Sequence, residues 1–539
     1  MLIKSKLQLA FSRAIKLQKK LRNEYLRKNS RYYVSTANFI MSEIRKRSIK
    51  AAIWIYVGFF IGAANTYFLT HKDWFTPDQN GLTRVIIESG QLIFAFSTLG
   101  TTSFLFKFFP YYKDNLEERK NDMLSLALTI ATIGFLICTG VLFFIEPLIV
   151  RKFSEKSILF VDYFQLIIPM GFFIMLYHIL EAYSYGFGKG VLTSILKETV
   201  LRFFTAIVIL LKIFNFIDFH TFIILFSFQY LIIVLLLAFH LKKNNQLWIN
   251  FGISRVTRKF RKKIIAIMGF TFIVVVVSML RQSIDGLVLA SKQNLGKVGI
   301  FGLAAYMSSV LQVPFRSMIA ITIPILSRSW KDKNLDEIQR IYKRSSINLL
   351  SFSLFAFFLI WLNFNDGIQL LGINADYMEG KNVFLLLGMV TIIEMGTGVN
   401  GQIIGTSTMW NFELWTSLLL TCLIIPLSYY LTVKYGLVGP AIANLVSFSV
   451  YNAIRLYFLW KKYRMQPFTI KTVEVLIIAA ISYGACLLFE QIHGWPGIVL
   501  KSLVFTSLFI TGIYVRSVSA DIRPVINNLL SRIGIKGIA

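Results

Sequence analysis

Apolar stretches of about 20 residues recur along the chain, with short polar segments between them. A stretch of that length crosses a bilayer as a helix, whereas a membrane β-barrel would alternate apolar and polar positions over about ten residues. The pattern therefore predicts an all-α polytopic membrane protein. It places about fourteen transmembrane helices near 49–70, 82–108, 123–146, 160–184, 192–213, 219–240, 264–290, 297–326, 346–364, 381–404, 412–433, 438–460, 471–490 and 498–516.

The composition argues against a soluble globular protein. Of the 539 residues, 55% are hydrophobic and only 16% are charged, whereas soluble domains carry about 25% charged residues. The net charge of +30 is assigned to loops held on the cytoplasmic side, so no nucleic-acid partner is expected. The three cysteines lie inside apolar stretches, so no disulfide framework, metal site or other cofactor is expected.

The distribution of lysine and arginine orients the helices. With the N-terminus in the cytoplasm, 42 of the 57 Lys and Arg residues fall in inside segments, 11 in outside loops and four within helices. This asymmetry follows the positive-inside rule and predicts an even number of spans with both termini cytoplasmic. The outside loops are all short, which argues against enzymes that need a folded extracytoplasmic domain.

The chain matches itself weakly at an offset near 217 residues. Pro110 pairs with Pro324, and the run 115–118 (NLEE) pairs with 334–337 (NLDE). A repeat unit of six spans keeps both copies in the same orientation, which predicts two six-helix lobes in parallel repeat around a central cavity, with alternating access. The expected parts are a basic cytoplasmic amphipathic arm, an N-lobe, a basic linker, a C-lobe, and two last helices with a cytoplasmic tail, at 1–46, 47–240, 241–263, 264–460 and 461–539.

In residues 1–46, apolar side chains recur near helical spacing with lysine and arginine between them. This pattern predicts an amphipathic helix that lies on the anionic lipids of the inner leaflet. Met41 opens a second plausible start for a membrane protein, so the alternative is that translation begins there.

Charged side chains within the predicted spans are candidates for function, because each costs about 2.5–3.5 kcal/mol to insert. Arg316 is the strongest candidate, because no acidic residue lies within one helical turn of it. It therefore needs an anion or a partner on another helix. Arg281 and Asp285 are four residues apart and so lie on one helix face, where they can form a structural pair or serve in function.

The same alternatives apply to Glu198 and Arg202. Glu88 lies one turn from Arg84 near the outer edge of its span, and Arg455 lies near a cytoplasmic end, where it is expected to extend toward the membrane surface. His178 is interpreted as a hydrogen-bonded core residue.

Motifs for catalysis are missing from the sequence. It contains no Walker A motif, no G-x-S-x-G or H-E-x-x-H motif, no D-x-D in a loop and no TVGYG filter. ATP-driven transport within this chain, enzymatic activity and a potassium channel are therefore not expected.

Three stretches resemble the polysaccharide-biosynthesis flippase family of the multidrug/oligosaccharidyl-lipid/polysaccharide exporter (MOP) superfamily, with O-antigen-type members as the nearest match. They are 96–114 (FSTLGTTSFLFKFFPYYKD), 283–327 and 429–447 (YYLTVKYGLVGPAIANLVS). The second is the most specific, because it contains Asp285, a G-x-V-G-I-F turn and the Pro324 ending. The third departs from the family pattern at 432–434 (TVK).

The resemblance implies a cavity walled by helices 1, 2, 7 and 8, in which cationic side chains receive a lipid-linked oligosaccharide. Arginine matches phosphate by bidentate donation, which suits a polyprenyl diphosphate. The expected function is a flippase for such a lipid, acting by alternating access as a monomer in the bacterial cytoplasmic (inner) membrane. The expected cavity residues are Arg316, Arg281, Asp285, Glu88 and Arg202.

Three other functions were weighed. A drug/cation antiporter of the same superfamily usually has twelve spans and an acidic residue in helix one, and helix one of this chain has none. A lipid II flippase also has fourteen spans and stays open as an alternative. A membrane enzyme of glycan assembly would call for large outside loops or paired loop carboxylates, and the sequence has neither.

Overall fold

The computed structural model describes residues 54, 56–519, 521 and 524, and within them it contains helices and turns but no strands. The predicted all-α polytopic fold is confirmed. A single antiparallel bridge between His71 and Ile373 joins two loops of the described part. The predicted arm at 1–46 lies outside the described residues, as does nearly all of the chain beyond residue 521.

The first half of the chain begins with a helix over residues 56–70, within the first predicted span. The α-helices that follow are α2 (Pro77–Ser97), α3 (Thr101–Asn115), α4 (Met123–Phe153), α5 (Ile158–Asp162), α6 (Ile167–Gly186), α7 (Gly190–Ile195), α8 (Leu201–Ile213), α9 (Phe219–Ser227) and α10 (Gln229–Lys243). A π-helical turn, η3 (Leu196–Val200), joins α7 to α8, and short 3₁₀ turns are η1 (Glu118–Lys120) and η2 (Phe164–Leu166).

The second half begins with α11 (Arg255–Lys292), the longest α-helix of the described residues. The helices that follow are α12 (Leu295–Val310), α13 (Val313–Lys331), α14 (Leu335–Leu362), α15 (Phe364–Leu370), α16 (Gly380–Gly396), α17 (Asn400–Gly405), α18 (Trp410–Tyr435), α19 (Gly439–Tyr463), α20 (Ile470–Leu487) and α21 (Gly494–Val515). Two 3₁₀ turns, η4 (Ala375–Glu379) and η5 (Gly436–Val438), lie between them.

The described residues contain eight helical stretches long and apolar enough to cross a membrane, or up to eleven if each bent helix pair counts as one span. The chain is therefore a multi-pass membrane protein, while the number fourteen stays a prediction. Three features account for the difference. The first helix is described only in part, the span predicted at 192–213 is interrupted by η3, and α18 and α19 are counted as one stretch although they fold back and pack on each other.

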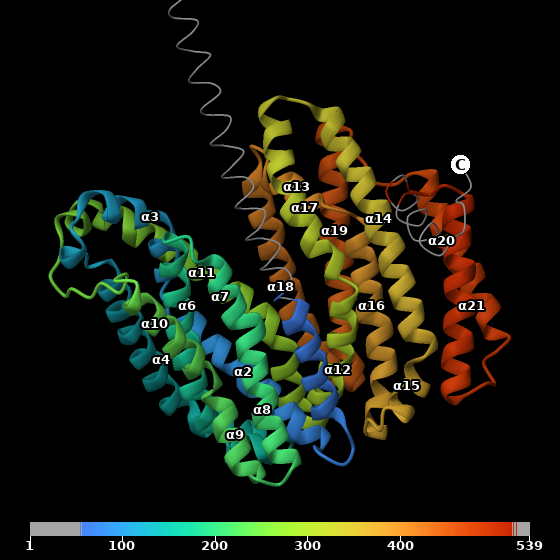
Figure 1. Ribbon diagram of the computed structural model, residues 1–539, viewed down its shortest axis with the longest axis horizontal. Helices are drawn as coiled ribbons and strands as arrows, with labels where there is room; N and C mark the ends of the chain where they lie inside the picture. The colour runs from blue at the N-terminus through green and yellow to red at the C-terminus, as the bar shows by residue number, and fades with distance from the viewer. Residues whose placement is uncertain (1–53, 55, 520, 522–523, 525–539) are drawn as a thin grey trace, which may run out of the picture.

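The helices form two groups that diverge toward one side of the molecule (Figure 1). One group contains α3, α4 and α6 to α10, and the other contains α12 to α21. The groups meet through α2, which packs against α6 in the first group and against α12 in the second. They are farthest apart on the side where α3 and α13 end, which is the side of the basic loops predicted to be cytoplasmic.

Two pairs of consecutive helices are sharply bent at corresponding places of the predicted repeat. The bend between α2 and α3 is 52°, and the bend between α12 and α13 is 50°. Each second helix contains the proline that the sequence comparison paired, Pro110 or Pro324. At the first bend Gly100 has φ 77°, and a Cβ there would overlap the carbonyl of Met268 on α11. Glycine is therefore required at this close approach.

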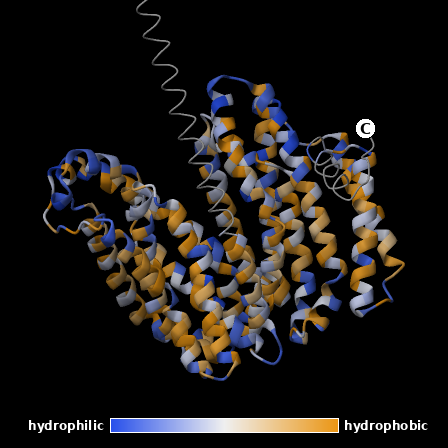
Figure 2. Ribbon diagram, viewed as in Figure 1, coloured by the Kyte–Doolittle hydropathy of each residue, from blue (hydrophilic) through white to orange (hydrophobic). Residues whose placement is uncertain are grey.

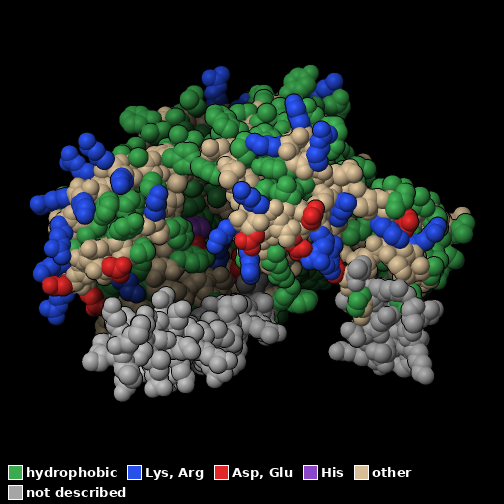
Figure 3. Space-filling model, turned by 90° about the horizontal axis from the view of Figure 1, so that it is seen from above, with side chains coloured by type: hydrophobic (Ala, Val, Ile, Leu, Met, Phe, Trp, Pro, Cys, Tyr) green, Lys and Arg blue, Asp and Glu red, His purple; other side chains and the backbone are tan. Residues whose placement is uncertain are grey.

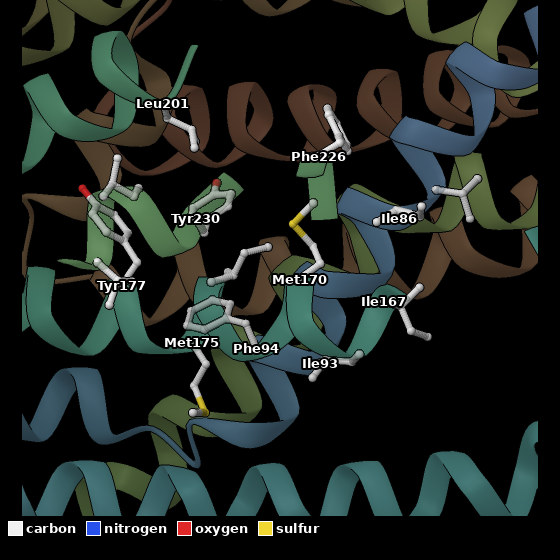
Figure 4. Close-up of a cluster of buried hydrophobic side chains, with 14 of the residues drawn as sticks. Ile86, Ile93, Phe94, Ile167, Met170, Met175, Tyr177, Leu201, Phe226 and Tyr230 are labelled. Carbon is white, nitrogen blue, oxygen red and sulfur yellow. The ribbon is translucent and has the colours of Figure 1, made fainter. Parts of the chain in front are cut away.

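Apolar side chains fill the first group. Figure 4 shows Ile86, Ile93 and Phe94 from α2 facing Met170 and Met175 from α6, with Leu201, Phe226 and Tyr230 of the neighbouring helices above them. The helices are mostly apolar along their length and the loops at their ends are polar (Figure 2), and many large apolar side chains are exposed, such as Phe144 on α4 at 87%. An apolar outer surface with polar loops at its ends is suited to contact with lipid chains.

Candidate functional site

A polar cavity of about 630 Å³ lies in the second helix group. Figure 3, which looks onto the open side, shows a hollow between the two groups with cationic and acidic side chains around it. Charged and amide side chains gather in the cavity from five helices and from the turn between α12 and α13, although these helices are mostly apolar. The charged ones are Arg281, Asp285, Glu394, Glu413 and Arg455, and the amides are Gln282, Gln312, Asn400, Gln402 and Asn444.

Asp285 on α11 is held by two helices of the second group. Ser428 Oγ on α18 donates to one carboxylate oxygen at 2.7 Å, and Asn444 Nδ2 on α19 donates to the other at 2.7 Å. The structural pair with Arg281, one of the two alternatives at this position, is therefore not formed. Among the described residues Arg281 makes no hydrogen bond and no ion pair of 4 Å or less, and its side chain lines the cavity together with Glu394.

Arg455 on α19 is buried rather than directed to the membrane surface, and the prediction for this residue is wrong. Its side chain is 8% exposed and pairs with Glu413 from the first turn of α18. Its guanidinium also lies 3.7 Å from the centroid of the Tyr451 ring and donates to Asn400 Oδ1 at 3.4 Å. A partly buried carboxylate and an aromatic face together compensate the desolvated cation, so it does not need to reach water.

A second polar cavity, of about 570 Å³, lies between the first helix group and α12. Two ion pairs between residues four apart lie at this cavity, and the second, Glu198–Arg202, is the structural alternative that the sequence offered for those residues. Arg84 Nε lies 2.8 Å from Glu88 Oε1, and Arg202 Nη2 lies 2.8 Å from Glu198 Oε2.

Arg202 is anchored further by the first helix of the chain. Arg202 Nη1 donates to the carbonyl of Gly58 at 3.0 Å. The backbone carbonyl of Arg202 in turn accepts from Asn65 Nδ2 at 2.8 Å. Its partner Glu198 belongs to the π-helical turn η3, a distortion that occurs often at functional sites. These contacts make Arg202 a positioned residue, in contrast to Arg281.

α11 separates the two polar cavities. Gln282 lines both of them, while Arg281 and Asp285 line only the one in the second group. α11 also packs against both groups. Tyr112 Oη on α3 lies 2.6 Å from Thr257 Oγ1 near the start of α11, and Ser283 Oγ donates to the carbonyl of Glu88 on α2 at 3.3 Å. In the second group, α11 packs against α18. A change in the angle between the groups would therefore act on the side chains of this helix.

The five expected cavity residues do not share one chamber. Glu88 and Arg202 line the cavity of the first group, and Arg281 and Asp285 line that of the second. Arg316 lies exposed on α13 and lines neither chamber, although its neighbour Phe315 lines the second. Sequence reasoning overlooked Glu413, whose position at the first turn of an apolar span was the only available signal.

Comparison with solved structures gives several matches to one fold. The lipid II flippase MurJ in an inward closed conformation aligns with a TM-score of 0.70 and 16% identity, covering 87% of this chain and 98% of MurJ. An inward-facing multidrug resistance MATE family transporter of the MOP superfamily aligns with a TM-score of 0.57 and 15% identity, covering 76% and 99%.

A MOP superfamily transporter from Pyrococcus furiosus, described as having a binding pocket of reverse polarity, aligns with a TM-score of 0.50 and 14% identity, covering 78% and 95%. No protein-family profile matches the sequence, and no curated protein matches it. These neighbours are transporters and a flippase rather than enzymes. This multi-pass membrane chain therefore has the fold of MurJ and the MATE transporters of the MOP superfamily.

Proposed function

We propose that this protein is a flippase that moves a lipid-diphosphate-linked oligosaccharide across the bacterial cytoplasmic membrane by alternating access. The observation that carries the proposal is Arg281, a guanidinium that makes no hydrogen bond or close ion pair among the described residues, in a polar cavity that apolar helices surround. Such a group is costly in a membrane unless an anion binds it. The fold shared with MurJ, a lipid II flippase, supports a lipid of this class.

The cavity of the second group suits the head of such a lipid. Its amide side chains can donate to and accept from sugar hydroxyls, and an arginine fork matches the diphosphate. In this proposal Arg281 and Arg316 hold the diphosphate, with Arg316 on the exposed face of α13. Asp285 and Glu88 compete for the arginines when the helix groups rock, and Arg202 orients the wall of the first cavity.

The proposal includes the setting of the protein. Both termini lie in the cytoplasm, the chain functions as a monomer, and its basic N-terminal arm contacts anionic lipids of the inner leaflet. The charge asymmetry of the loops supports this orientation. The helix groups then diverge toward the cytoplasm, where the substrate is loaded.

Transport by the purified protein tests the proposal. Proteoliposomes containing a polyprenyl-diphosphate-linked oligosaccharide are expected to move it to the opposite leaflet, as measured by its accessibility to an added glycosidase. Arg281→Ala and Arg316→Ala are each expected to nearly abolish movement, and Arg316→Lys to retain part of it because charge survives without bidentate geometry. Normal movement in both alanine variants, at wild-type protein levels, would refute the assignment of the arginines.

Lipid II is the second candidate substrate, and the coverage of almost the whole MurJ chain favours it. The same assay with lipid II in place of the longer glycan distinguishes the two. A drug/cation antiporter would instead move an organic cation and leave both lipids in place. In cells, depletion of the protein stops this transport. A lipid-linked oligosaccharide is then expected to accumulate on the cytoplasmic face of the membrane.

A further inference from the structure

An apolar groove of about 520 Å³ runs between α11 and α18. We call it the α11–α18 groove and define it by Phe270, Ile273, Val274 and Val277 on α11 and by Leu414 and Trp415 on α18. Ile273 is 58% exposed and Trp415 is 71% exposed, so no other part of the described chain covers the groove. A long apolar chain could therefore lie along it.

The groove meets the polar cavity at its inner end. Arg281 and Ser417 line both the groove and the cavity of the second helix group. The passage from an apolar surface to a polar chamber thus occurs at one arginine. This arginine is also the cavity cation that has no hydrogen bond or ion pair among the described residues.

The dimensions fit the inner half of a bilayer. Eleven residues separate Phe270 from Arg281 on one helix, a rise of about 17 Å, which is roughly half of the hydrocarbon thickness of ~30 Å. Trp410 and Trp415 lie in the first turns of α18, and tryptophan is typical of the membrane–water interface. The groove therefore runs from the predicted cytoplasmic surface to the depth of the arginine.

We propose that the α11–α18 groove holds the isoprenoid chain of the lipid carrier while Arg281 contacts its diphosphate and the glycan enters the polar cavity. This inference rests on the proposed function and assigns the route of the tail. The three parts match in order: an apolar channel, Arg281 at the junction, and a chamber of 630 Å³ with amide side chains. A membrane phospholipid would fill the first two parts, but its small head group would leave the chamber without a polar occupant.

Photo-crosslinking tests the occupant directly. The photoreactive residue p-benzoylphenylalanine is placed at Val277 in the groove or at Phe144, an exposed position on α4 that serves as the matched control. The full-length protein is placed in vesicles of anionic phospholipid that contain a polyprenyl-diphosphate-linked sugar. We expect capture of the polyprenyl lipid at Val277 to exceed capture at Phe144, and Arg281→Gln to lower it about tenfold through loss of a charge-assisted hydrogen bond. Equal capture at both positions, or capture of phospholipid alone, would overturn the inference.

Filling the groove provides a second measurement. Val277→Trp and, independently, Leu414→Trp are expected to slow transport of the lipid severalfold, whereas Phe144→Trp leaves it unchanged. Only variants whose melting temperature in detergent equals that of the wild type are compared. If both tryptophan variants fail to fold, the crosslinking at Val277 in the protein without tryptophan substitutions tests the inference. If the wild type captures the lipid but does not transport it, the proposed function fails and the groove assignment stands. If the wild type transports it and filled variants transport equally well, the groove assignment fails and the function stands.

Discussion

Replacing Lys501 by methionine is expected to loosen the attachment of α20 and α21 to the rest of the protein. Lys501 Nζ on α21 donates to Asp366 Oδ2 on α15 at 2.6 Å, and both side chains are only 6% exposed. After the substitution, Asp366 keeps one side-chain partner, His493, whose Nδ1 lies 3.3 Å from Asp366 Oδ1 and whose side chain is 73% exposed. The variant thus leaves a buried carboxylate with a weak, hydrated partner.

The size of the effect follows from the burial of the pair. Removing one member of a buried ion pair costs about 3–5 kcal/mol, which changes a local opening equilibrium by roughly two to four orders of magnitude. Apolar contacts between α14 and the two helices, such as Phe355 with Phe505 and Phe509, also attach them. In lipid they supply no hydrophobic driving force, so the ion pair carries a larger share of the attachment.

Hydrogen exchange of the protein in lipid nanodiscs measures this opening. Amides of α20 and α21 are expected to exchange faster in Lys501→Met, while those of α16 keep their wild-type rates. Lys471→Met is the matched control, because its ion pair with Glu474 is 37% and 23% exposed and its hydrogen bond to the carbonyl of Arg516 at the end of α21 is also exposed. Solvent-exposed contacts of this kind are expected to contribute only about 1 kcal/mol.

A double substitution separates the lost contact from the stranded charge. Lys501→Met combined with Asp366→Asn is expected to cost less than Lys501→Met alone, because no uncompensated buried charge remains. The reasoning fails if Lys501→Met accelerates exchange in α20 and α21 no more than Lys471→Met does.

Three further predictions address pH, packing and topology. Burial raises the pKa of Asp366, but Lys501 and His493 outweigh burial and hold the pKa below its usual value. The stability that the Lys501–Asp366 pair contributes is therefore complete above about pH 3.9 and is lost as the pH falls through the pKa of Asp366 in the folded protein. Hydrogen exchange of α21, corrected for intrinsic rates, should show no transition between about pH 5 and pH 8. Gly81→Ala is expected to lower the melting temperature, because the added Cβ would overlap the carbonyl of Leu295 where α2 meets α12 and overpacking costs about 1–3 kcal/mol; Gly269→Ala, whose Cβ would enter open space, should not. A reporter fused after the last residue, 539, should read cytoplasmic, and an extracytoplasmic signal would contradict the charge-based topology.

The sequence by itself determined the class of the fold and the local ion pairs. Runs of apolar residues are long enough to span a bilayer wherever they occur, so they do not depend on tertiary contacts. The pairs Arg84–Glu88 and Glu198–Arg202 could also be anticipated, because residues four apart share a helix face in any helix. The paired prolines, Pro110 and Pro324, each lie in the second helix of a sharply bent pair.

Only the tertiary structure decided which charges lack a partner. Asp285 could satisfy either Arg281 in its own helix or polar groups elsewhere, and its partners prove to be Ser428 and Asn444, which are 143 and 159 residues away in the chain. Arg455 is buried because α18 brings Glu413 to it. Helical spacing fixes neighbours within a helix, but the contact of one helix with another depends on the crossing and rotation of both, and no local pattern in the sequence specifies these.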